Sequence, residues 1–197
     1  MSMEFLEAEL ESGYCASIIG PMFAGKTTAD IRILRDCRKR GIKALGFKPT
    51  CDTRYGDGAV FHSHDNDTES CILIDDIQEV LANPDYNEAH VIIIEEAHFF
   101  DNSILNVIDQ MMIDKKKVVI SGLSGSYQQK CIGSMANIMA MSDSIIQLFA
   151  TCEYCDTITN APFTIKVNGS HTALEVGSKE IYKPVCRKHF TKYDDSI

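Results

Sequence analysis

The sequence has few of the features that mark membrane, secreted and nucleic-acid-binding proteins. No apolar run approaches the roughly 20 residues of a membrane-spanning helix, and the acidic start MSMEFLEAELESG has neither the basic flank nor the apolar centre of a signal peptide. Basic residues number 19 against 28 acidic ones, a net charge of −9, which disfavours a broad surface for nucleic acid or anionic lipid. Repeats and low-complexity segments are also missing. We therefore expect a cytoplasmic protein that partners neither nucleic acid nor membrane.

Disulfides are not expected either, although the chain has eight cysteines. In an intracellular protein of 197 residues, with 45% hydrophobic residues for a core, cysteines indicate thiols or metal ligands. The isolated cysteines are expected to be core or surface thiols, and they are Cys15, Cys37, Cys51, Cys71 and Cys131.

Short apolar runs alternate with amphipathic stretches through the first three quarters of the chain. The runs predict strands at Tyr14–Gly20, Ile42–Lys48, Val91–Glu95, Lys117–Gly122 and Ile145–Ala150. Helices are predicted at Lys26–Arg40, which Gly41 ends, and at Ser103–Met112. Strands that alternate with helices favour a parallel sheet covered on both faces. We predict an α/β, P-loop (RecA-like) domain over residues 1–150 and a smaller C-terminal zinc-binding lobe over residues 151–197, where apolar periodicity weakens.

The segment GPMFAGKT fits the phosphate-loop pattern G-x-x-x-x-G-K-[ST] at every specified position and lies between a predicted strand and a predicted helix. Glycines let backbone N–H groups surround phosphates, and the helix N-terminus adds a favourable field. Lys26 is expected to reach the β- and γ-phosphates of ATP, and Thr27 to bind Mg²⁺. The predicted nucleotide-binding residues are Gly20, Pro21, Met22, Phe23, Ala24, Gly25, Lys26 and Thr27.

Two adjacent acids, Glu95 and Glu96, come at the carboxyl end of the most apolar predicted strand, where open α/β sheets bind ligands. One acid can order the magnesium shell, and the other can accept the proton of an acceptor hydroxyl. Adjacent strand residues point to opposite faces, so either their roles differ or the strand ends between them. We assign Glu95 to magnesium and Glu96 to the catalytic base.

Two paired motifs near the C-terminus, Cys152-x-x-Cys155 and Cys186-x-x-His189, are separated by 30 residues. Together they supply the four ligands of a closed tetrahedral Zn²⁺ site. No coordination position stays open, so the predicted role of the metal is structural. The segment between the pairs is long enough to form a lid.

These motifs occur in one order that resembles a known enzyme family. The order comprises GPMFAGKTT, DTRY at Asp52–Tyr55, His64-Asp65, EEAHFF at Glu95–Phe100, GSYQQK at Gly125–Lys130 and the C-terminal CxxC…CRKH. It is similar to that of the cytosolic, zinc-containing (type II) thymidine kinases, and the resemblance covers about Tyr14 to Phe190. The resemblance implies an ATP- and Mg²⁺-dependent kinase that converts thymidine to thymidine monophosphate, with structural zinc. It also implies a homotetramer inhibited by thymidine triphosphate, and it leaves the acceptance of deoxyuridine open.

The resemblance also implies particular binding residues. Beside the ATP phosphates it places Asp52, Thr53, Arg54 and His98. Around the thymine ring it places Met22, Phe99, Leu123, Tyr127 and Thr164, together with a lasso loop of Ala173, Leu174, Glu175, Val176 and Gly177 and with Tyr182. The chain departs from the family at Glu95 and Ser124, where Asp is usual, and at His98, where Gln is usual.

Two other classes of protein share some of these motifs. Glu95-Glu96-Ala97-His98 differs by one carboxylate from the DEAH box of helicases, which indicates a nucleic-acid-dependent ATPase. Such enzymes need a second domain or a ring, and a basic channel for the strand, which an acidic chain disfavours. A zinc-knuckle binding module without activity leaves the phosphate loop unexplained. Dependence of ATP turnover on thymidine, on polynucleotide or on neither separates the three.

Overall fold

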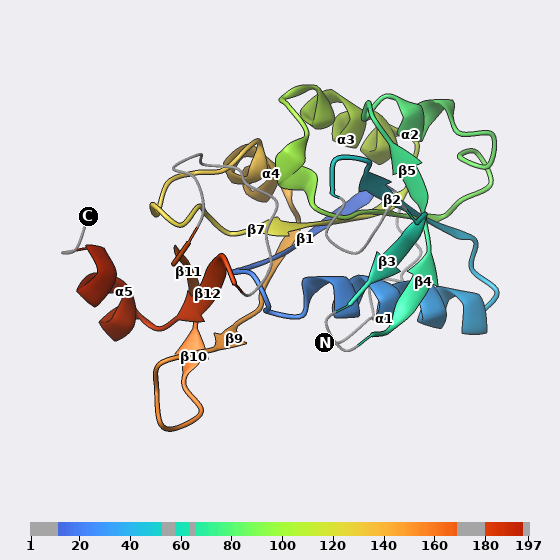
Figure 1. Cartoon of the computed structure of the whole chain (residues 1–197). Helices are drawn as coiled ribbons and strands as arrows, with labels where there is room; N and C mark the ends of the chain where they lie inside the picture. The colour runs from blue at the N-terminus through green and yellow to red at the C-terminus, as the bar shows by residue number, and fades with distance from the viewer. Residues whose placement is uncertain (1–11, 53–57, 64–65, 169–179, 195–197) are drawn as a thin grey trace.

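A central parallel sheet organises the chain, seen in a computed structural model that describes residues 12–52, 58–63, 66–168 and 180–194, with side chains up to residue 190. The six-stranded sheet has the order β5-β2-β6-β7-β1-β8, and every neighbouring pair is parallel. Figure 1 shows α1 covering one face of the sheet and α2, α3 and α4 covering the other. Among these residues we find no helix with the length and apolar character that a membrane crossing requires.

The predicted strands and helices lie at or near their predicted positions, whereas β5, α2 and α4 are further elements that the sequence did not predict. The strands of the sheet are β1 (Tyr14–Gly20), β2 (Ala44–Pro49), β5 (Ile72–Ile74), β6 (Val91–Ile94), β7 (Lys117–Leu123) and β8 (Ser144–Gln147). The helices around it are α1 (Lys26–Lys39), α2 (Glu79–Ala82), α3 (Ser103–Ile113) and α4 (Met135–Met141). The covered parallel sheet confirms the predicted α/β class.

Both faces of β6 are buried, which explains its unbroken apolar sequence. Ile92 and Ile94 pack into the larger hydrophobic cluster, on the side of α3 and α4. Val91 and Ile93 pack into a second cluster with Ile31 and other residues of α1. The alternation assigns each residue of β6 to a face, and the carboxyl ends of these strands point toward the phosphate loop.

Two predicted strands differ most from the strands in the structure. The predicted strand Ile42–Lys48 starts later, at Ala44, because the N–H of Ile42 donates to the carbonyl oxygen of Cys37 at 2.9 Å and closes the end of α1. The predicted strand Ile145–Ala150 is divided, since β8 ends at Gln147 and Ala150 begins β9 (Ala150–Thr151), which pairs with β10 (Asn160–Ala161) outside the main sheet.

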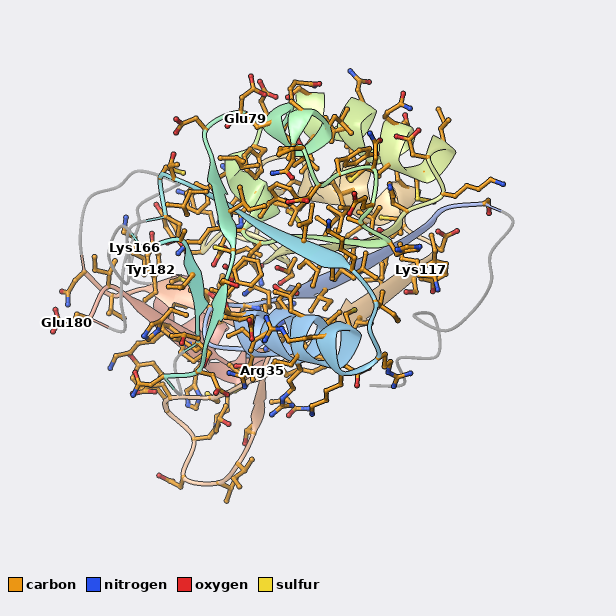
Figure 2. All side chains as sticks on the ribbon, turned by 90° about the vertical axis from the view of Figure 1, so that its right-hand side faces the viewer. Arg35, Glu79, Lys117, Lys166, Glu180 and Tyr182 are labelled. Atoms are coloured by element: carbon orange, nitrogen blue, oxygen red, sulfur yellow. The ribbon has the colours of Figure 1, made fainter. Side chains whose placement is uncertain are left out.

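A small antiparallel hairpin, β3 (Val60–His62) with β4 (Thr68–Ser70), lies against α1. Arg35 of α1 holds it through Asp67 at 3.1 Å and Glu69 at 3.4 Å, and Figure 2 shows Arg35 on the helix near this hairpin.

The C-terminal lobe has a hydrophobic cluster of its own. It contains β9, β10, the antiparallel pair β11 (Phe163–Lys166) and β12 (Tyr182–Val185), and α5 (Arg187–Asp194). Ala161, Ile165 and Val185 form part of its core, against which Phe23 and Ala24 of the phosphate loop also pack. The lobe therefore contacts the main domain at the loop that precedes α1.

Candidate active site

The phosphate loop turns between β1 and α1 through unusual backbone angles. Phe23 and Gly25 have φ angles of 67° and 82°, a left-handed region that favours glycine. Gly20 is needed for another reason, because an added Cβ would lie 2.7 Å from the carbonyl oxygen of Leu148. Gly25 is the N-cap residue of α1, and no side chain caps the helix. The N–H groups of its first turn are therefore available to phosphate oxygens.

The side chain of Lys26 folds back onto this loop. Its ammonium group donates to the carbonyl oxygen of Pro21 at 2.8 Å and to that of Gly20 at 3.4 Å. Neutral carbonyls are weaker acceptors for an ammonium group than phosphate oxygens are, because hydrogen bonds between charged groups are stronger. Lys26 is thus positioned at the loop to exchange these acceptors for a phosphate.

The two acids lie directly after β6, at the same edge of the sheet as the phosphate loop. Glu95 and Glu96 are both buried, at 3% and 5% exposure. The N–H of Glu95 donates to the carbonyl oxygen of Phe47 at 2.9 Å, whereas Glu96 has a left-handed φ of 52°. The predicted strand Val91–Glu95 therefore ends at Ile94, and the regular alternation of the strand stops between the two acids.

His98 lies beside Glu96 on a single 3-10 turn, η2 (Ala97–Phe99). Its Nδ1 is 3.3 Å from Oε2 of Glu96 and 3.5 Å from the backbone nitrogen of Leu123. The imidazole is buried, so its contact with Glu96 is shielded from water. Because this Nδ1 accepts the N–H of Leu123, it does not donate to Oε2 of Glu96 in the same state, and His98 packs beside the carboxylate.

A second buried cation lies at the end of β2. Lys48 contacts Asp52 with 3.2 Å between Nζ and Oδ2, and both side chains are 3% exposed. The pair places Asp52 at the carboxyl edge of the sheet, next to the strand that carries Glu95. Thr53 and Arg54, which the sequence also assigns to the nucleotide, lie outside the described residues.

A third acid, Asp30, is completely buried between α1 and the sheet. The hydroxyl of Ser121 on β7 donates to its Oδ2 at 2.5 Å, with a neighbouring Oδ1 that accepts no hydrogen bond from the described residues. Burial raises the pKa of the Asp30 carboxyl well above its usual range, and the charge of Glu95 raises it further, against the opposing effect of Ser121. Glu96 also raises this pKa and Lys26 lowers it.

This pKa predicts a pH-dependent stability effect for Asp30→Asn. The folded protein binds the Asp30 proton more tightly than the unfolded chain does, so the wild type loses stability as pH rises above the usual value of about 3.9. We expect the ligand-free variant to melt at a higher temperature than wild type at pH 8, and the difference to shrink toward pH 4. Thermal unfolding across this range measures it. Asp109→Asn, at an exposed position of α3, serves as the control, and a difference independent of pH would contradict the assignment.

The residues predicted to contact the acceptor come together from both lobes. The N–H of Met22 in the phosphate loop donates to Oγ1 of Thr164 on β11 at 3.0 Å. Lys166 lies over two aromatic rings, with Nζ 5.4 Å from the ring centroid of Tyr127 and 5.6 Å from that of Tyr182. Figure 2 shows Lys166 and Tyr182 next to each other.

Two more residues that are predicted to contact the acceptor, Phe99 and Leu123, lie next to His98. The ring centroid of Phe99 lies 4.4 Å from that of His98, and the backbone of Leu123 approaches the same imidazole. The lasso residues Ala173, Leu174, Glu175, Val176 and Gly177 lie outside the described residues. The described residues that are predicted to contact the acceptor therefore come from five separate stretches of the chain.

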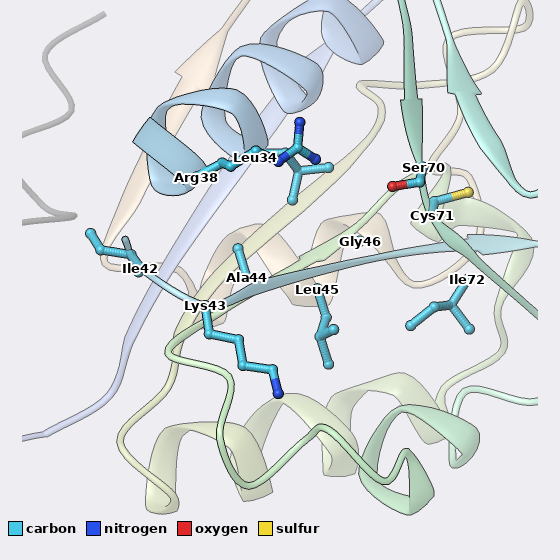
Figure 3. A pocket seen from close by; sticks show the side chains of 10 residues that line it. All are labelled: Leu34, Arg38, Ile42, Lys43, Ala44, Leu45, Gly46, Ser70, Cys71 and Ile72. Atoms are coloured by element: carbon cyan, nitrogen blue, oxygen red, sulfur yellow. The ribbon is translucent and has the colours of Figure 1, made fainter. Parts of the chain in front are cut away.

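A cavity of about 490 Å³ opens beside this pocket, between the phosphate loop, the loop after β7 and the C-terminal lobe. Pro21 and Thr164 line it, together with the cations Lys130 and Arg187. A smaller cavity of about 320 Å³ lies away from these residues, around the start of β2. Figure 3 shows Ala44 of that strand facing α1, while Lys43 and Leu45 face the other way. Of these two cavities, the first touches the predicted site.

The predicted zinc ligands form a compact cluster in the C-terminal lobe. The ligand atoms of Cys152, Cys155, Cys186 and His189 all lie within 4.8 Å of one another. Sγ of Cys155 is 3.8 Å from Sγ of Cys186, and Nδ1 of His189 is 3.3, 3.5 and 3.5 Å from the three sulfurs. A tetrahedral Zn²⁺ with its usual bond lengths gives roughly 3.8 Å between sulfurs and roughly 3.6 Å between sulfur and nitrogen. The four residues therefore fit a zinc ion.

The electrostatics of Cys152 also suit a metal ligand. Burial opposes ionisation of its thiol, but hydrogen bonds with the backbone of Cys186 and Tyr154 and with the side chain of His189 outweigh this effect and lower the pKa to about 6. The thiolate is the form that binds metals. By contrast, burial raises the pKa of the isolated Cys15 to about 11, which suits the inert core thiol expected from the sequence.

The structure also reveals residues near the site that the sequence reasoning missed. The sequence contained a weak indication that Lys48 is functional, since this lysine ended a predicted buried strand. Asp30 had another, because it falls on the apolar face of α1 among Ile31, Ile33 and Leu34. Ser121 and Lys166 had none, as nothing in their local sequence distinguishes them from ordinary strand residues.

A phosphate loop connects β1 to the N-terminus of α1 at the edge of a parallel sheet. This arrangement places the chain in the class of phosphate-loop enzymes that act on nucleotides. Within that class, a family profile described as "Thymidine kinase" matches residues 13–190. The chain therefore belongs to the thymidine kinase family.

Individual relatives agree with this assignment. A "Thymidine kinase" of Onion yellows phytoplasma is 33% identical over 189 residues, covering 93% of this chain and 89% of that protein. One from Yaba monkey tumor virus is 33% identical over 184 residues, covering 93% and 98%, and "Thymidine kinase a" of Arabidopsis thaliana is 33% identical over 182 residues, covering 91% and 75%. Among solved structures, AMPPCP-bound DnaA from Aquifex aeolicus has a TM-score of 0.43 and 11% identity, covering 74% of this chain and 44% of that one.

Proposed function

We propose that this enzyme transfers the γ-phosphate of ATP to the 5′-hydroxyl of thymidine, giving thymidine monophosphate and ADP. Besides family membership, one observation carries the proposal. Glu96 is buried at the same edge of the sheet as the phosphate loop. A carboxylate shielded from water and contacted by His98 can serve as a base for an acceptor hydroxyl, provided that the acceptor reaches it.

In the proposed reaction the acceptor and the nucleotide meet between Glu96 and the phosphate loop. Glu96 accepts the proton of the 5′-hydroxyl, the 5′-oxygen bonds to the γ-phosphorus, and the bond from that phosphorus to the β,γ-bridging oxygen breaks. Lys26 exchanges the carbonyls of Gly20 and Pro21 for phosphate oxygens and offsets the charge that remains on ADP. The described residues therefore include a base for the proton, Glu96, and a cation for the phosphate charge, Lys26.

We assign Thr27 and Glu95 to magnesium within this proposal. A hydroxyl and a carboxylate are the oxygen donors that Mg²⁺ prefers, and the burial of Glu95 fits a group compensated by a cation. When bound, the ion neutralises phosphate charge. Asp52, Thr53, Arg54 and His98 complete the proposed nucleotide side.

For the acceptor, we propose that Met22, Phe99, Leu123, Tyr127, Thr164 and Tyr182 surround the base, with the lasso residues 173–177 above it. Pairing of Thr164 with the loop at Met22 supports this placement, because it joins the acceptor pocket to the phosphate loop. A structural zinc ion, a homotetramer, feedback by thymidine triphosphate and a cytoplasmic location belong to the same proposal through the family.

The test is the acceptor dependence of ATP turnover. We expect phosphate from γ-labelled ATP to appear in thymidine monophosphate, while neither polynucleotide nor buffer alone stimulates ADP release. Deoxyuridine lacks one methyl group of thymidine. We expect kcat/KM for the two acceptors to differ by no more than about 1–3 kcal/mol in activation free energy, the contribution of one such group in a hydrophobic pocket. Turnover that needs polynucleotide and ignores thymidine would replace this proposal with the ATPase alternative.

A further inference from the structure

The packing of α1 does not explain why residue 30 is an aspartate. Most of its neighbours on the buried face of α1 are apolar, and Ile31, Ile33 and Leu34 pack into the hydrophobic cluster between α1 and the sheet. Asp30 is 0% exposed, and only one of its two carboxylate oxygens is hydrogen-bonded by the described residues. Burying a carboxyl oxygen without a partner is unfavourable. An apolar residue at this position would avoid that destabilisation.

The position of Asp30 on α1 relates it to the phosphate loop. It lies four residues after Lys26 and three after Thr27, spacings that bring side chains to the same side of a helix. Lys26 and Thr27 are the two residues of the loop proposed to contact the γ-phosphate and the magnesium ion. Asp30 therefore lies one helical turn below them.

The sheet brings Glu95, the other residue assigned to magnesium, close to Asp30. In β7, Ser121 follows Ile120, and Ile120 is in register with Ile94 of β6. The next residue of that chain, Glu95, thus lies beside Ser121 and, by alternation from Ile93, on the face covered by α1. The hydroxyl of Ser121 holds Asp30 against this face. The raised pKa of Asp30, caused in part by Glu95 and Glu96, agrees with this proximity.

We propose that Asp30 is a third carboxylate of the magnesium site, in the shell outside the proposed ligands Thr27 and Glu95, and that Ser121 fixes it there through Oδ2. This inference rests on the proposed function, which assigns Thr27 and Glu95 to the metal. Mg²⁺ sheds its water reluctantly and is commonly held by few direct protein ligands. Loss of an outer-shell partner in metal sites typically lowers metal affinity or activity about 10–100-fold. Asp30 is accordingly a positioning residue rather than a catalytic one.

The experiment measures metal affinity without turnover. Mn²⁺, observed by electron paramagnetic resonance, is titrated into the full-length protein saturated with ADP, for wild type, Asp30→Asn and Ser121→Ala. Asparagine retains an acceptor for Ser121 but presents N–H groups in place of the free oxygen. We expect Asp30→Asn to weaken Mn²⁺ binding about 10–100-fold and Ser121→Ala to weaken it less, because the carboxylate stays but is less well oriented.

The control is Asp36→Asn, which removes an acid from the same helix where it pairs with Arg40 at 2.7 Å. Unchanged Mn²⁺ affinity in a folded Asp30→Asn protein would overturn the inference and make Asp30 a structural residue. If Asp30→Asn does not fold, Ser121→Ala decides, since wild-type Mn²⁺ affinity in that variant also overturns it. The proposed function fails separately, if the wild type transfers no phosphate to thymidine.

Discussion

Glu96→Gln should lower kcat by about 10²–10⁴-fold, the usual contribution of a general base, while leaving ATP binding nearly unchanged. Glutamine has almost the same shape and can still contact His98, but its amide cannot accept the proton of the 5′-hydroxyl. Because Lys26 and the loop amides are untouched, the nucleotide keeps its principal contacts. Steady-state kinetics with thymidine, together with equilibrium binding of an ATP analogue, separates the two effects.

The matched control is Glu88→Gln, at a surface glutamate that pairs with Lys43 at 2.6 Å and is 75% exposed. A pair this exposed contributes little to stability, so kcat should stay at the wild-type value. A Glu96→Gln enzyme within a factor of a few of wild type would show that the proton leaves by another route. His98, 3.3 Å from Glu96, would then be the next residue to test.

Loss of the zinc site should have the other large effect. Cys155→Ala leaves three ligands of a cluster whose spacing fits Zn²⁺, and structural zinc contributes about 10–16 kcal/mol of apparent binding free energy in small domains. The hydrophobic cluster of the lobe is small, so we expect the lobe to lose its fold and the protein to melt at a lower temperature. Elemental analysis should find about one zinc per wild-type chain and little in the variant.

The functional consequence follows from what the lobe carries. Thr164, Lys166 and Tyr182 belong to its strands β11 and β12, so the KM for thymidine should rise strongly. ATP binding should weaken less, although the lobe also contacts the phosphate loop through Met22 and Phe23. Cys131→Ala, at an exposed free cysteine, is the control and should match wild type. A zinc-free protein that is folded and binds thymidine normally would contradict this coupling.

Contiguous motifs could be read from the sequence because their geometry is local. The phosphate loop needs a strand, a glycine turn and a helix in immediate succession, and Gly20–Thr27 contains the whole unit. The zinc ligands are similar, since each C-x-x-C or C-x-x-H pair sets its own spacing and a metal joins the two. The alternation of apolar runs and helices also determined the α/β class, because parallel strands that are buried on both faces, such as β6, are mostly apolar.

The turn between Glu95 and Glu96 shows the limit of such reading. A period of two left open whether the acids face opposite sides or whether the strand ends between them. The sequence around Glu96 contains no glycine to mark a left-handed residue, and yet φ is 52° there. The contact of His98 with the backbone of Leu123 forms only when β6 and β7 lie side by side.

Tertiary structure alone decided which distant residues meet at the site. Asp30, Ser121 and Glu95 come from a helix and two strands, and their proximity depends on the register of β6 with β7 and on the face that α1 covers. Lys166 approaches Tyr127 because β11 pairs with β12 and the lobe folds back on the loop after β7. Local sequence patterns predict the individual helices and strands. Strand register and the position of the lobe depend on packing among those elements, which no local pattern encodes.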